Sequence, residues 1–600
     1  MNKIALLQLF FLFFNTYVST QCIQNPASTN AYPKRDLRGV FISTVFNLNW
    51  PTNRLATPAA QQAELIEILD TVKANGYNTV FFQVRSECDA LYNSALEPWS
   101  YRLTGTQGLA PTPLWDPLAF AITEAHNRGI DLHAWLNPYR ASANVTSYTL
   151  SPNHVINTHP SWIISASNNG NLKILDPGLP AVQEYIKNIV QDIASRYDID
   201  GIHFDDYFYP TSGMATNQDA ATFAAHNPTG IATIADWRRH SVNTMIGKVY
   251  DALQGINASQ NKTILFGVSP FGVWKSGIPT GITGTSSFYD MYCDPIAWLT
   301  AGKVDYLAPQ LYWKITGAQD YITLSKWWND QVAASGKQLY VSQGYYKLTD
   351  TNNWAASEIQ NQIIQNRATS MEATFGQIAY NYSSIKNNDK TINTVLQSGS
   401  YQFKSFAPPV AGKDDICPNV PENIRFEGLY LKWDTPGIAS DNDLPKKYVV
   451  YAFDSELDAT NNREESSKIL DIVAANQLLI DSEIALTKYF VVTSLDKNNN
   501  ENGDFSQTLH LMHSDLNKEN EIQVYPNPFE NFFLIQKPSD YFGSLKIKLI
   551  DLSGKTIWQQ LILPGTSVIK INPTGISAGF YFGKVELEDG SSKSFKISKE

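Results

Sequence analysis

The feature that most constrains this chain is a repeat of strand-like and helix-like segments between Arg38 and Ser384. Eight runs rich in apolar, β-branched or aromatic residues are typical of buried strands. They are Arg38–Thr44, Asn78–Arg85, Ile130–Asn137, Gly201–Tyr207, Thr263–Phe271, Val304–Trp313, Gln338–Tyr345 and Thr374–Tyr382. Amphipathic stretches lie between them, among them Ala59–Asn75, Asp116–Arg128, Pro180–Tyr197 and Trp237–Leu253. This alternation predicts a (β/α)8 TIM barrel, which we expect over residues 34–400.

The sequence changes in character after Ser400. The segment 401–421 contains Pro408, Pro409, Pro418 and Pro421, which predicts a linker. The short alternating runs Leu429–Trp433, Lys447–Phe453 and Lys488–Ser494 predict a small β-sandwich over residues 422–512, with one helix-like stretch near Glu464–Asn476. A second, shorter all-β unit is expected over residues 521–600. The predicted fold class is therefore multidomain, a TIM barrel followed by two small all-β domains.

The amino terminus has the features of a secretory signal peptide. Lys3 precedes the apolar run Ile4–Phe14, and the small residues Ser19 and Thr20 follow. These features predict a signal peptide over residues 1–20. The apolar run is too short to span a bilayer, and no later run approaches the ~18 apolar residues that a spanning helix needs, so we expect no transmembrane segment. Lipidation of Cys22 is an alternative, although the preceding residues lack the usual leucine.

Composition excludes several classes of function. The net charge is −11 and there is no run of lysines or arginines, which argues against nucleic-acid binding. The four cysteines, Cys22, Cys88, Cys293 and Cys417, include no CxxC pair, so neither a zinc ribbon nor a disulfide scaffold is expected. They could form one or two bridges or stay as free thiols. The 14 Trp, 30 Tyr and 29 Phe suit either carbohydrate-facing surfaces or a large barrel core.

Polar side chains collect where the predicted strands end. In a TIM barrel the carboxyl ends of the strands meet at one face, and side chains there build the active site. Placing many polar groups at one face is costly unless they bind something. We therefore expect the substrate to contact residues drawn from these strands and the turns after them: Arg38, Gln83, Arg85, His133, Trp135, Asn137, Tyr139, Arg140, His203, Tyr207, Ser269, Trp274, Gln310, Tyr312 and Trp313.

Carboxyl groups near these strand ends are the candidate acids and bases. Acid–base catalysis of bond cleavage commonly uses two such groups, one protonated and one ionised. Asp205 shares a strand face with His203 and is expected to face the pocket. Asp206 either turns in past the strand end or pairs with an arginine or a backbone amide. The candidate catalytic residues are Asp205, Asp206 and Glu87, with Asp89, Asp290 and Asp294 as open alternatives for the partner carboxyl.

Several of these stretches resemble the glycosyl-hydrolase-like family ten barrel. Asp200–Pro210 (DGIHFDDYFYP) and Ala125–Arg140 are close to the signatures of that family, and the resemblance covers Lys34 to Ser384. It implies a glycoside hydrolase, and bacterial members include enzymes that act on cell-wall glycan stripped of its peptides. The segment Ser86–Asp89 departs from the family, in which a proline and a glycine are more usual.

The two C-terminal units carry resemblances of their own. Leu431–Trp433 and Tyr489–Asp496 resemble a fibronectin type III module. The tail resembles the type nine secretion sorting domain through Val524–Pro528, Asp551–Lys555, Gly579–Tyr581 and Lys596–Lys599. This second resemblance implies that outer-membrane secretion machinery is a partner and that the protein is secreted or displayed at the cell surface.

These observations predict a secreted glycoside hydrolase that acts on a polysaccharide and uses no organic cofactor or metal. Its mechanism is left open between retention, inversion and attack by an N-acetyl group of the sugar, and Tyr207 stands where chitinase-like enzymes carry their acid. One alternative is a non-catalytic, glycan-binding surface protein. Another is a metal-dependent polysaccharide deacetylase, with His133, His203 and Asp205 as ligands.

Overall fold

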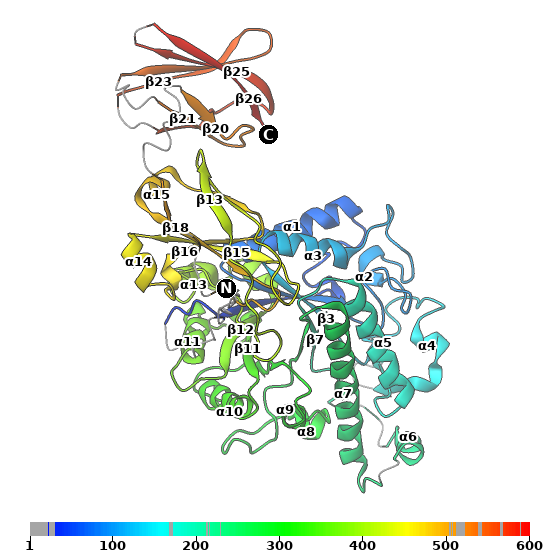
Figure 1. Ribbon diagram of the computed structural model, residues 1–600. Helices are drawn as coiled ribbons and strands as arrows, with labels where there is room; N and C mark the ends of the chain where they lie inside the picture. The colour runs from blue at the N-terminus through cyan, green and yellow to red at the C-terminus, as the bar shows by residue number, and fades with distance from the viewer. Residues whose placement is uncertain are drawn as a thin grey trace, which may run out of the picture.

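A computed structural model gives the structure of the chain. It describes residues 22, 31–166, 172–211, 214, 217–227, 230–502, 506, 508–511, 522–537, 543–564, 568–588 and 590–600. The predicted signal peptide, residues 1–20, lies outside the described residues. Figure 1 shows three parts in chain order: a large barrel, a sandwich in yellow and a tail domain in orange and red.

The first part is a closed barrel of parallel strands, which confirms the predicted fold class. The strands are β1 (Leu37–Ile42), β2 (Thr79–Arg85), β3 (Asp131–Leu136), β7 (Gly201–Phe204), β8 (Leu265–Val268), β9 (Tyr306–Leu307) continued by β10 (Gln310–Leu311), β11 (Gln338–Gly344) and β12 (Thr374–Tyr380). Each pairs in parallel with the next, and β12 pairs with β1 to close the ring. The strands are buried because helices cover the outside and side chains fill the inside.

Helices follow the strands as the amphipathic pattern predicts. The main ones are α1 (Pro58–Ala74), α3 (Pro117–Asn127), α5 (Pro180–Arg196), α7 (Ile234–Gln260), α10 (Tyr321–Ala333) and α11 (Ala356–Asn366). Shorter ones are α2 (Tyr101–Thr104), α4 (Val155–Thr158), α6 (Ala220–Ala225), α8 (Ser287–Asp290), α9 (Pro295–Thr300), α12 (Tyr382–Lys386) and α13 (Ile392–Gln397). Thr57 and Asp116 cap α1 and α3 by accepting backbone N–H groups, each just before a proline at the first helical position.

Aromatic side chains fill the barrel interior. Phe41, Phe81, Trp135, Tyr306 and Tyr340 form one buried cluster there. Gly267 in β8 makes room for the ring of Tyr306, because a Cβ at that position would lie 1.9 Å from the ring. The interior is therefore a packed core, and space for a ligand is left at the strand ends.

A small antiparallel sheet is inserted after β3, which the strand pattern did not predict. It consists of β4 (Arg140–Ser142), β5 (Ile163–Ala166) and β6 (Leu172–Leu175), in the order β4-β6-β5. Its strands are only three or four residues long, too short to give a periodic signal. The insertion lies on the carboxyl side of the barrel and brings Arg140 and Leu172 to the cavity described below.

The second part is a sandwich of two antiparallel sheets, consistent with an immunoglobulin-like module. One sheet holds β13 (Glu422–Glu427), β14 (Tyr430–Asp434) and β17 (Gln477–Leu479). The other holds β16 (Ile469–Val473), β15 (Lys447–Phe453), β18 (Tyr489–Leu495) and β19 (Leu509–His510). The helix-like interpretation of Glu464–Asn476 is wrong, because Ile469–Val473 pairs with β15 as a strand. Two short helices, α14 (Glu456–Asn461) and α15 (Ser482–Thr487), complete the module.

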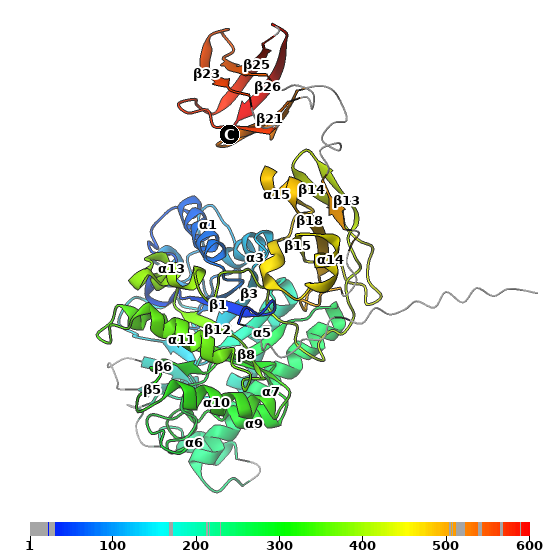
Figure 2. The same ribbon diagram turned by 90° about the vertical axis from the view of Figure 1, so that its left-hand side faces the viewer.

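The tail domain is also built from two sheets. They are β20 (Gln523–Tyr525), β21 (Phe533–Gln536) and β24 (Val568–Ile571), and then β23 (Thr556–Ile562), β22 (Leu545–Ile550), β25 (Gly579–Leu587) and β26 (Ser592–Lys599). In both ribbon views this domain lies beyond the sandwich, away from the barrel (Figures 1 and 2). No helix among the described residues is long and apolar enough to cross a membrane.

The segment 401–421 is packed, in contrast to the linker that its prolines predict. Tyr401, Phe406 and Val410 are buried. Lys413 forms a 2.8 Å ion pair with Asp305 at the start of β9, and Cys417 is bonded to Cys22. Proline restricts the backbone in packed and unpacked segments alike, so proline content alone did not show that this segment is buried. Cys88 and Cys293 are buried free thiols.

The sandwich lies against the barrel (Figure 2). Its ion pairs are with residues at the amino ends of the barrel strands. Lys447 forms a buried ion pair with Asp131 at the start of β3, and Asn499 donates to the same carboxylate at 3.0 Å. Arg35, just before β1, pairs with the buried Glu501 at 2.9 Å. The carboxyl ends of the strands are left uncovered by the sandwich, and the site lies there.

Candidate active site

A cavity of about 440 Å³ lies at the carboxyl ends of the barrel strands. A volume of this size suits a small organic ligand. It is lined by Phe46, Arg140, Ala143, Leu172, Asp206, Tyr207, Tyr209, Pro210, Thr211, Phe271 and Met291. The lining combines one carboxylate and one guanidinium with several aromatic and apolar groups, a composition typical of binding sites.

Asp205 directly follows β7 and is buried, with 5% of its surface exposed. Its Oδ2 accepts two hydrogen bonds from the neighbouring strand end, from Trp135 Nε1 at 3.0 Å and from Asn137 Nδ2 at 3.3 Å. Asn137 is held in turn, because its Oδ1 accepts the backbone N–H of Arg140 at 2.9 Å. Asp205 is therefore fixed just behind the cavity lining.

Asp206 lines the cavity itself. Sequence left two orientations open for this side chain, and the structure has the inward one. The strand β7 ends at Phe204, so the alternation of faces no longer applies two residues later. The amide of Gln310 and the charge of Arg140 both favour the ionised form of Asp206.

The pKa of each carboxyl group is raised. Burial, and then the charge of Asp206, raises the pKa of Asp205 to about 7. Burial also raises the pKa of Asp206. Since two adjacent carboxylates cannot both ionise cheaply in a buried site, the pair titrates as a unit and holds a proton at mildly acidic pH. Such a pair can supply a proton to a leaving group.

Tyr207 and Arg140 form a stacked pair at the mouth of the cavity. Tyr207 is 49% exposed, and the guanidinium of Arg140 lies 4.6 Å from the centroid of its ring. The charge of Asp206 is the largest cause that raises the pKa of Tyr207 to about 12. The phenol is therefore protonated at neutral pH and can donate a hydrogen bond beside the carboxyl pair.

Phe46 is an exposed aromatic residue at the cavity edge that sequence reasoning missed. It is 62% exposed and has φ 57°, a left-handed conformation that is rare for a bulky side chain. Its ring lies 5.0 Å from the guanidinium of Arg102. Strained residues of this kind concentrate at binding sites, and an exposed ring can stack on a sugar face.

A tyrosine cluster flanks the carboxyl pair. Tyr312 stacks on Tyr380 with ring centroids 5.7 Å apart, and Tyr346 meets both rings edge-on. The charge of Asp206 contributes to the raised pKa of Tyr312 and of Tyr380, so both phenols lie near the carboxyl pair. Tyr380 ends β12, and the strand-end rule could have identified it.

The match to known proteins agrees with this arrangement. A family model described as Glycosyl hydrolase-like 10 matches residues 36–365, which is more than half of the chain. The chain belongs to this family. A second model, the secretion system C-terminal sorting domain, matches residues 523–600. That domain directs type IX secretion, so the protein is secreted or held at the cell surface.

Two relatives of this glycosyl hydrolase-like 10 chain are named glycosyl hydrolases. Glycosyl hydrolase YngK of Bacillus subtilis (strain 168) is 34% identical over 416 residues, covering 68% of this chain and 79% of the relative. Glycosyl hydrolase DigH of Escherichia coli (strain K12) is 37% identical over 344 residues, covering 54% and 76%.

Glu87, a predicted catalytic residue, is hydrogen-bonded to neighbouring protein groups in this glycosyl hydrolase-like 10 barrel. It is fully buried and does not line the cavity. Its Oε2 accepts from Arg102 at 2.9 Å and from the hydroxyl of Tyr148 at 3.3 Å, and its Oε1 accepts the N–H of Ala143 at 2.7 Å. The structure therefore places Glu87 where it positions loops, including Arg102 beneath Phe46.

Arg85 and Gln83 are likewise hydrogen-bonded to neighbouring groups of the protein. Arg85 is 1% exposed and donates to both oxygens of the buried Glu97. Gln83 accepts the N–H groups of Thr44 at 3.0 Å and Val45 at 2.9 Å, which fixes the turn after β1. The structure does not bring either side chain to the cavity lining.

His133 and His203 lie in the barrel interior, below the cavity. The hydroxyl of Tyr306 lies 2.8 Å from His133 Nδ1 and 3.0 Å from His203 Nδ1. Burial lowers the pKa of His133 to about 4 and lowers that of His203 well below its usual value, so both are neutral. Among the described residues they do not converge with Asp205 into a three-ligand group. Ser269 is also interior, where it donates to Ala308 O at 2.6 Å.

Two further predicted contacts lie outside the cavity. Arg38 is at the opposite, amino end of the barrel, where it pairs with Asp36 at 2.8 Å and lies over the ring of Tyr401. It lies at the start of β1, whereas the cavity lies at the carboxyl ends of the strands, so the prediction that Arg38 binds substrate is corrected. Tyr139 is fully buried against Phe208 in the outer core.

Two of the predicted tryptophans, Trp274 and Trp313, lie outside the cavity lining. Trp313 is half-buried and contacts Phe271, a lining residue, edge-on at 5.8 Å. Trp274 donates to Asp294 at 3.0 Å and stacks on Trp327 at 5.6 Å, which draws it away from the lining.

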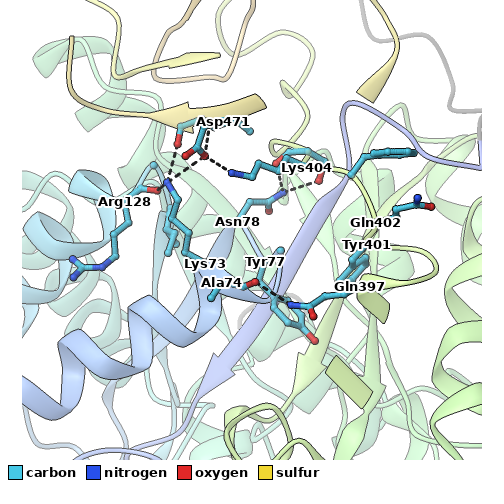
Figure 3. Close-up of a pocket in the computed structure, with 16 residues that line it drawn as sticks. Lys73, Ala74, Tyr77, Asn78, Arg128, Gln397, Tyr401, Gln402, Lys404 and Asp471 are labelled. Atoms are coloured by element: carbon cyan, nitrogen blue, oxygen red, sulfur yellow. Dashed lines mark hydrogen bonds and ion pairs between the residues drawn. The ribbon is translucent and has the colours of Figure 1, made fainter. Parts of the chain in front are cut away.

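A second cavity, of about 210 Å³, lies at the amino ends, between the barrel and the sandwich (Figure 3). Its polar groups are already paired. Lys73 donates to the backbone oxygens of Arg128 at 2.8 Å and Ile472 at 2.9 Å, and Lys404 pairs with Asp471 at 2.7 Å. These contacts join the two domains, so this cavity is part of their interface.

Proposed function

We propose that this chain is a glycoside hydrolase that cleaves glycosidic bonds of a polysaccharide at the carboxyl face of its barrel. One observation carries the proposal: Asp206 lines a cavity while Asp205, held by Trp135 and Asn137, lies directly behind it. A pure binder gains little from two adjacent, partly protonated carboxyl groups. A hydrolase needs a proton donor at this place.

In this proposal the carboxyl pair holds one proton, and Asp206, the member that faces the cavity, passes it to the glycosidic oxygen as the bond to the sugar breaks. Asp205 is held in a fixed position behind Asp206, and its charge influences how readily Asp206 gives up the proton. Asp206 is the one carboxylate among the described lining residues, so the attacking group is best supplied from elsewhere. An N-acetyl oxygen of the substrate can take that role, as in substrate-assisted glycosidases. We expect Tyr207 and Arg140, which stack on each other beside Asp206, to hold the acetamido group.

The substrate that suits this site is a β-linked glycan containing N-acetylated sugars, with peptide-stripped cell-wall glycan as first choice. Phe46, Phe271 and Tyr207 offer faces for sugar rings, and Arg140 offers a partner for an acetamido or lactyl oxygen. Stem peptides would add bulk at the rim, so stripped glycan should react faster than intact peptidoglycan.

The test is to digest intact peptidoglycan, amidase-treated glycan, N-acetylated oligosaccharides and a neutral glucan, and to count new reducing ends. Wild type and Asp206→Asn are compared on each. We expect cleavage of the stripped glycan by wild type only. Saturable binding without new reducing ends would support the glycan-binding alternative, and release of acetate without cleavage would support a deacetylase. Cleavage of the neutral glucan alone would overturn the substrate proposal.

A further inference from the structure

Three aspartates converge where the barrel meets the sandwich. Asp414 belongs to the packed segment 401–421, and Asp441 and Asp443 belong to the loop between β14 and β15. One carboxylate oxygen from each lies within 4.8 Å of the other two. The cluster is remote from the active site, because it lies on the sandwich side of the barrel.

Two carboxylate oxygens in this cluster are buried without a hydrogen-bond partner. Asp443 is 7% exposed, and its Oδ1 accepts from Lys497 at 2.7 Å and Asn261 at 3.2 Å, whereas its Oδ2 has no donor. Asp414 is similar, since its Oδ1 accepts the N–H of Ile416 at 3.0 Å and its Oδ2 has no donor. The two carboxyl groups lie within hydrogen-bonding range of each other, which two carboxylates can do at low cost only if they share a proton or a cation. Buried anionic oxygens without donors are costly unless a cation meets them.

The positive charge around this cluster is smaller than the negative charge of its carboxylates. Asp496 lies beside Asp414, and its own oxygens accept from the backbone of Asn498 and Asn500. Formally, Asp414, Asp441 and Asp443 carry three negative charges against the one positive charge of Lys497, an excess of two.

We propose that Asp414, Asp441 and Asp443 bind a calcium ion. The donors are all carboxylate oxygens, which hard cations prefer. They come from two segments of the chain, and calcium tolerates the irregular geometry that results better than magnesium does. The sorting domain directs the protein out of the cell, where calcium sites of modest affinity are occupied.

The ion would connect the sandwich to the barrel. Asn261, at the end of α7, donates to the backbone oxygen of Asp441 at 3.0 Å and to the carboxylate of Asp443. Asp414 in turn lies three residues before Cys417, which is bonded to Cys22. A bound cation would therefore hold together the loop 441–443, the segment 401–421 and, through Asn261, the barrel.

The experiment uses the full mature chain, stripped with EGTA and titrated with CaCl2 by calorimetry, with the melting temperature followed in parallel. We expect one equivalent bound with Kd of about 10⁻⁴–10⁻³ M and a melting temperature that rises with calcium. Asp441→Asn and Asp414→Asn should each weaken binding at least tenfold. Asp415→Asn is the matched control, since it removes an exposed charge from the same segment and should bind calcium as wild type does.

Wild type that shows no saturable calcium binding would overturn the proposal. Wild-type affinity in both Asp441→Asn and Asp414→Asn would overturn it as well, as would equal stabilisation by MgCl2 at the same concentration. Asp441 is only partly buried, so Asp441→Asn decides the matter if Asp414→Asn does not fold.

Discussion

Trp135 donates its indole N–H to the Oδ2 of Asp205 across 3.0 Å, between the ends of two adjacent barrel strands. This hydrogen bond fixes the Asp205 carboxyl group behind Asp206 and lowers its pKa. Burial and the charge of Asp206 act in the opposite direction and raise the pKa of Asp205. The indole itself is almost fully buried, so it holds the carboxyl without reaching the substrate.

Asp206→Asn should lower kcat by on the order of 10³-fold with KM nearly unchanged, because the variant keeps the shape of the cavity but loses the transferable proton. The measurement is reducing-end formation on the best substrate, with the melting curve as a check that the fold is intact. A wild-type rate in this variant would contradict the assignment.

Asp205→Asn should stabilise the protein above mildly acidic pH. The pKa of Asp205 is raised from 3.8 to about 7 on folding, so the folded state binds the proton more tightly and stability falls as pH rises through that window. Asparagine does not titrate, so the variant should match wild type near pH 4. It should exceed wild type by at least about 1 kcal/mol at pH 8 in denaturant unfolding. A constant difference across this range would contradict the shifted titration.

Glu87→Gln should affect stability more than chemistry. The change leaves the buried Arg102 without its counter-charge, for which we expect a loss of about 2–4 kcal/mol in the free energy of unfolding. We expect kcat within about tenfold of wild type, since proton transfer, worth 10²–10⁴-fold, is left intact. Asp206→Asn is the comparison, for which we expect the opposite pattern: a large loss of kcat with little loss of stability. A stable Glu87→Gln variant with a large loss of kcat would restore Glu87 as a catalytic candidate.

The barrel should depend on the sandwich for stability. The sequence predicts a barrel domain over residues 34–400 and a linker after it. A chain that ends at Gly412, however, leaves three buried aspartates without their lysine partners: Asp131 without Lys447, Asp200 without Lys446 and Asp305 without Lys413. We expect this shorter chain to melt at a lower temperature or to be insoluble. Equal melting temperatures for the truncated and full mature chains would contradict the structural role of this interface.

A double-mutant cycle isolates one of these ion pairs. Lys447→Met should cost about 3–5 kcal/mol because Asp131 stays buried without its charge partner. Adding Asp131→Leu should recover most of that loss, and additive effects of the two changes would contradict the coupling.

Deleting Ile522–Glu600 should leave kcat and KM unchanged while the protein accumulates in the periplasm. The tail domain contacts the sandwich, for example at Gly428 and Tyr525, and no tail residue lines the cavity among the described residues. Cell fractionation tests the predicted location, and kinetics on the purified variant test the predicted kcat and KM. Normal release of the truncated protein to the medium would contradict the sorting role.

Sequence predicts the barrel well because its signal is local. Each strand is a short apolar run and each helix a longer amphipathic one, so period and length identify them separately. The observed α1, α3 and α5 differ from the predicted ranges by one residue at each end at most. Segments without a period, such as β4–β6 and the packed stretch 401–421, gave no comparable signal.

The site is predictable only in part. Arg140, Asp205, Asp206 and Tyr207 were expected at the strand ends and lie at the cavity or directly behind it. Glu87 and Arg85 have the same local pattern, yet each is neutralised by a partner that the chain brings in later. A strand-end position therefore indicates which side chains reach one face, without showing which are already paired.

The amino-acid sequence by itself determined the eightfold strand–helix order, the export tail and the acidic pair after the fourth strand, because periodicity and contiguous motifs are encoded within a few residues. Only the tertiary structure decided which polar groups face the cavity. Arg102 pairs with Glu87 and Tyr306 bridges His133 and His203, whereas Asp206 is left lining the cavity. The physical reason is that burial and hydrogen bonding depend on neighbours in space, which fold closure brings together from distant parts of the chain.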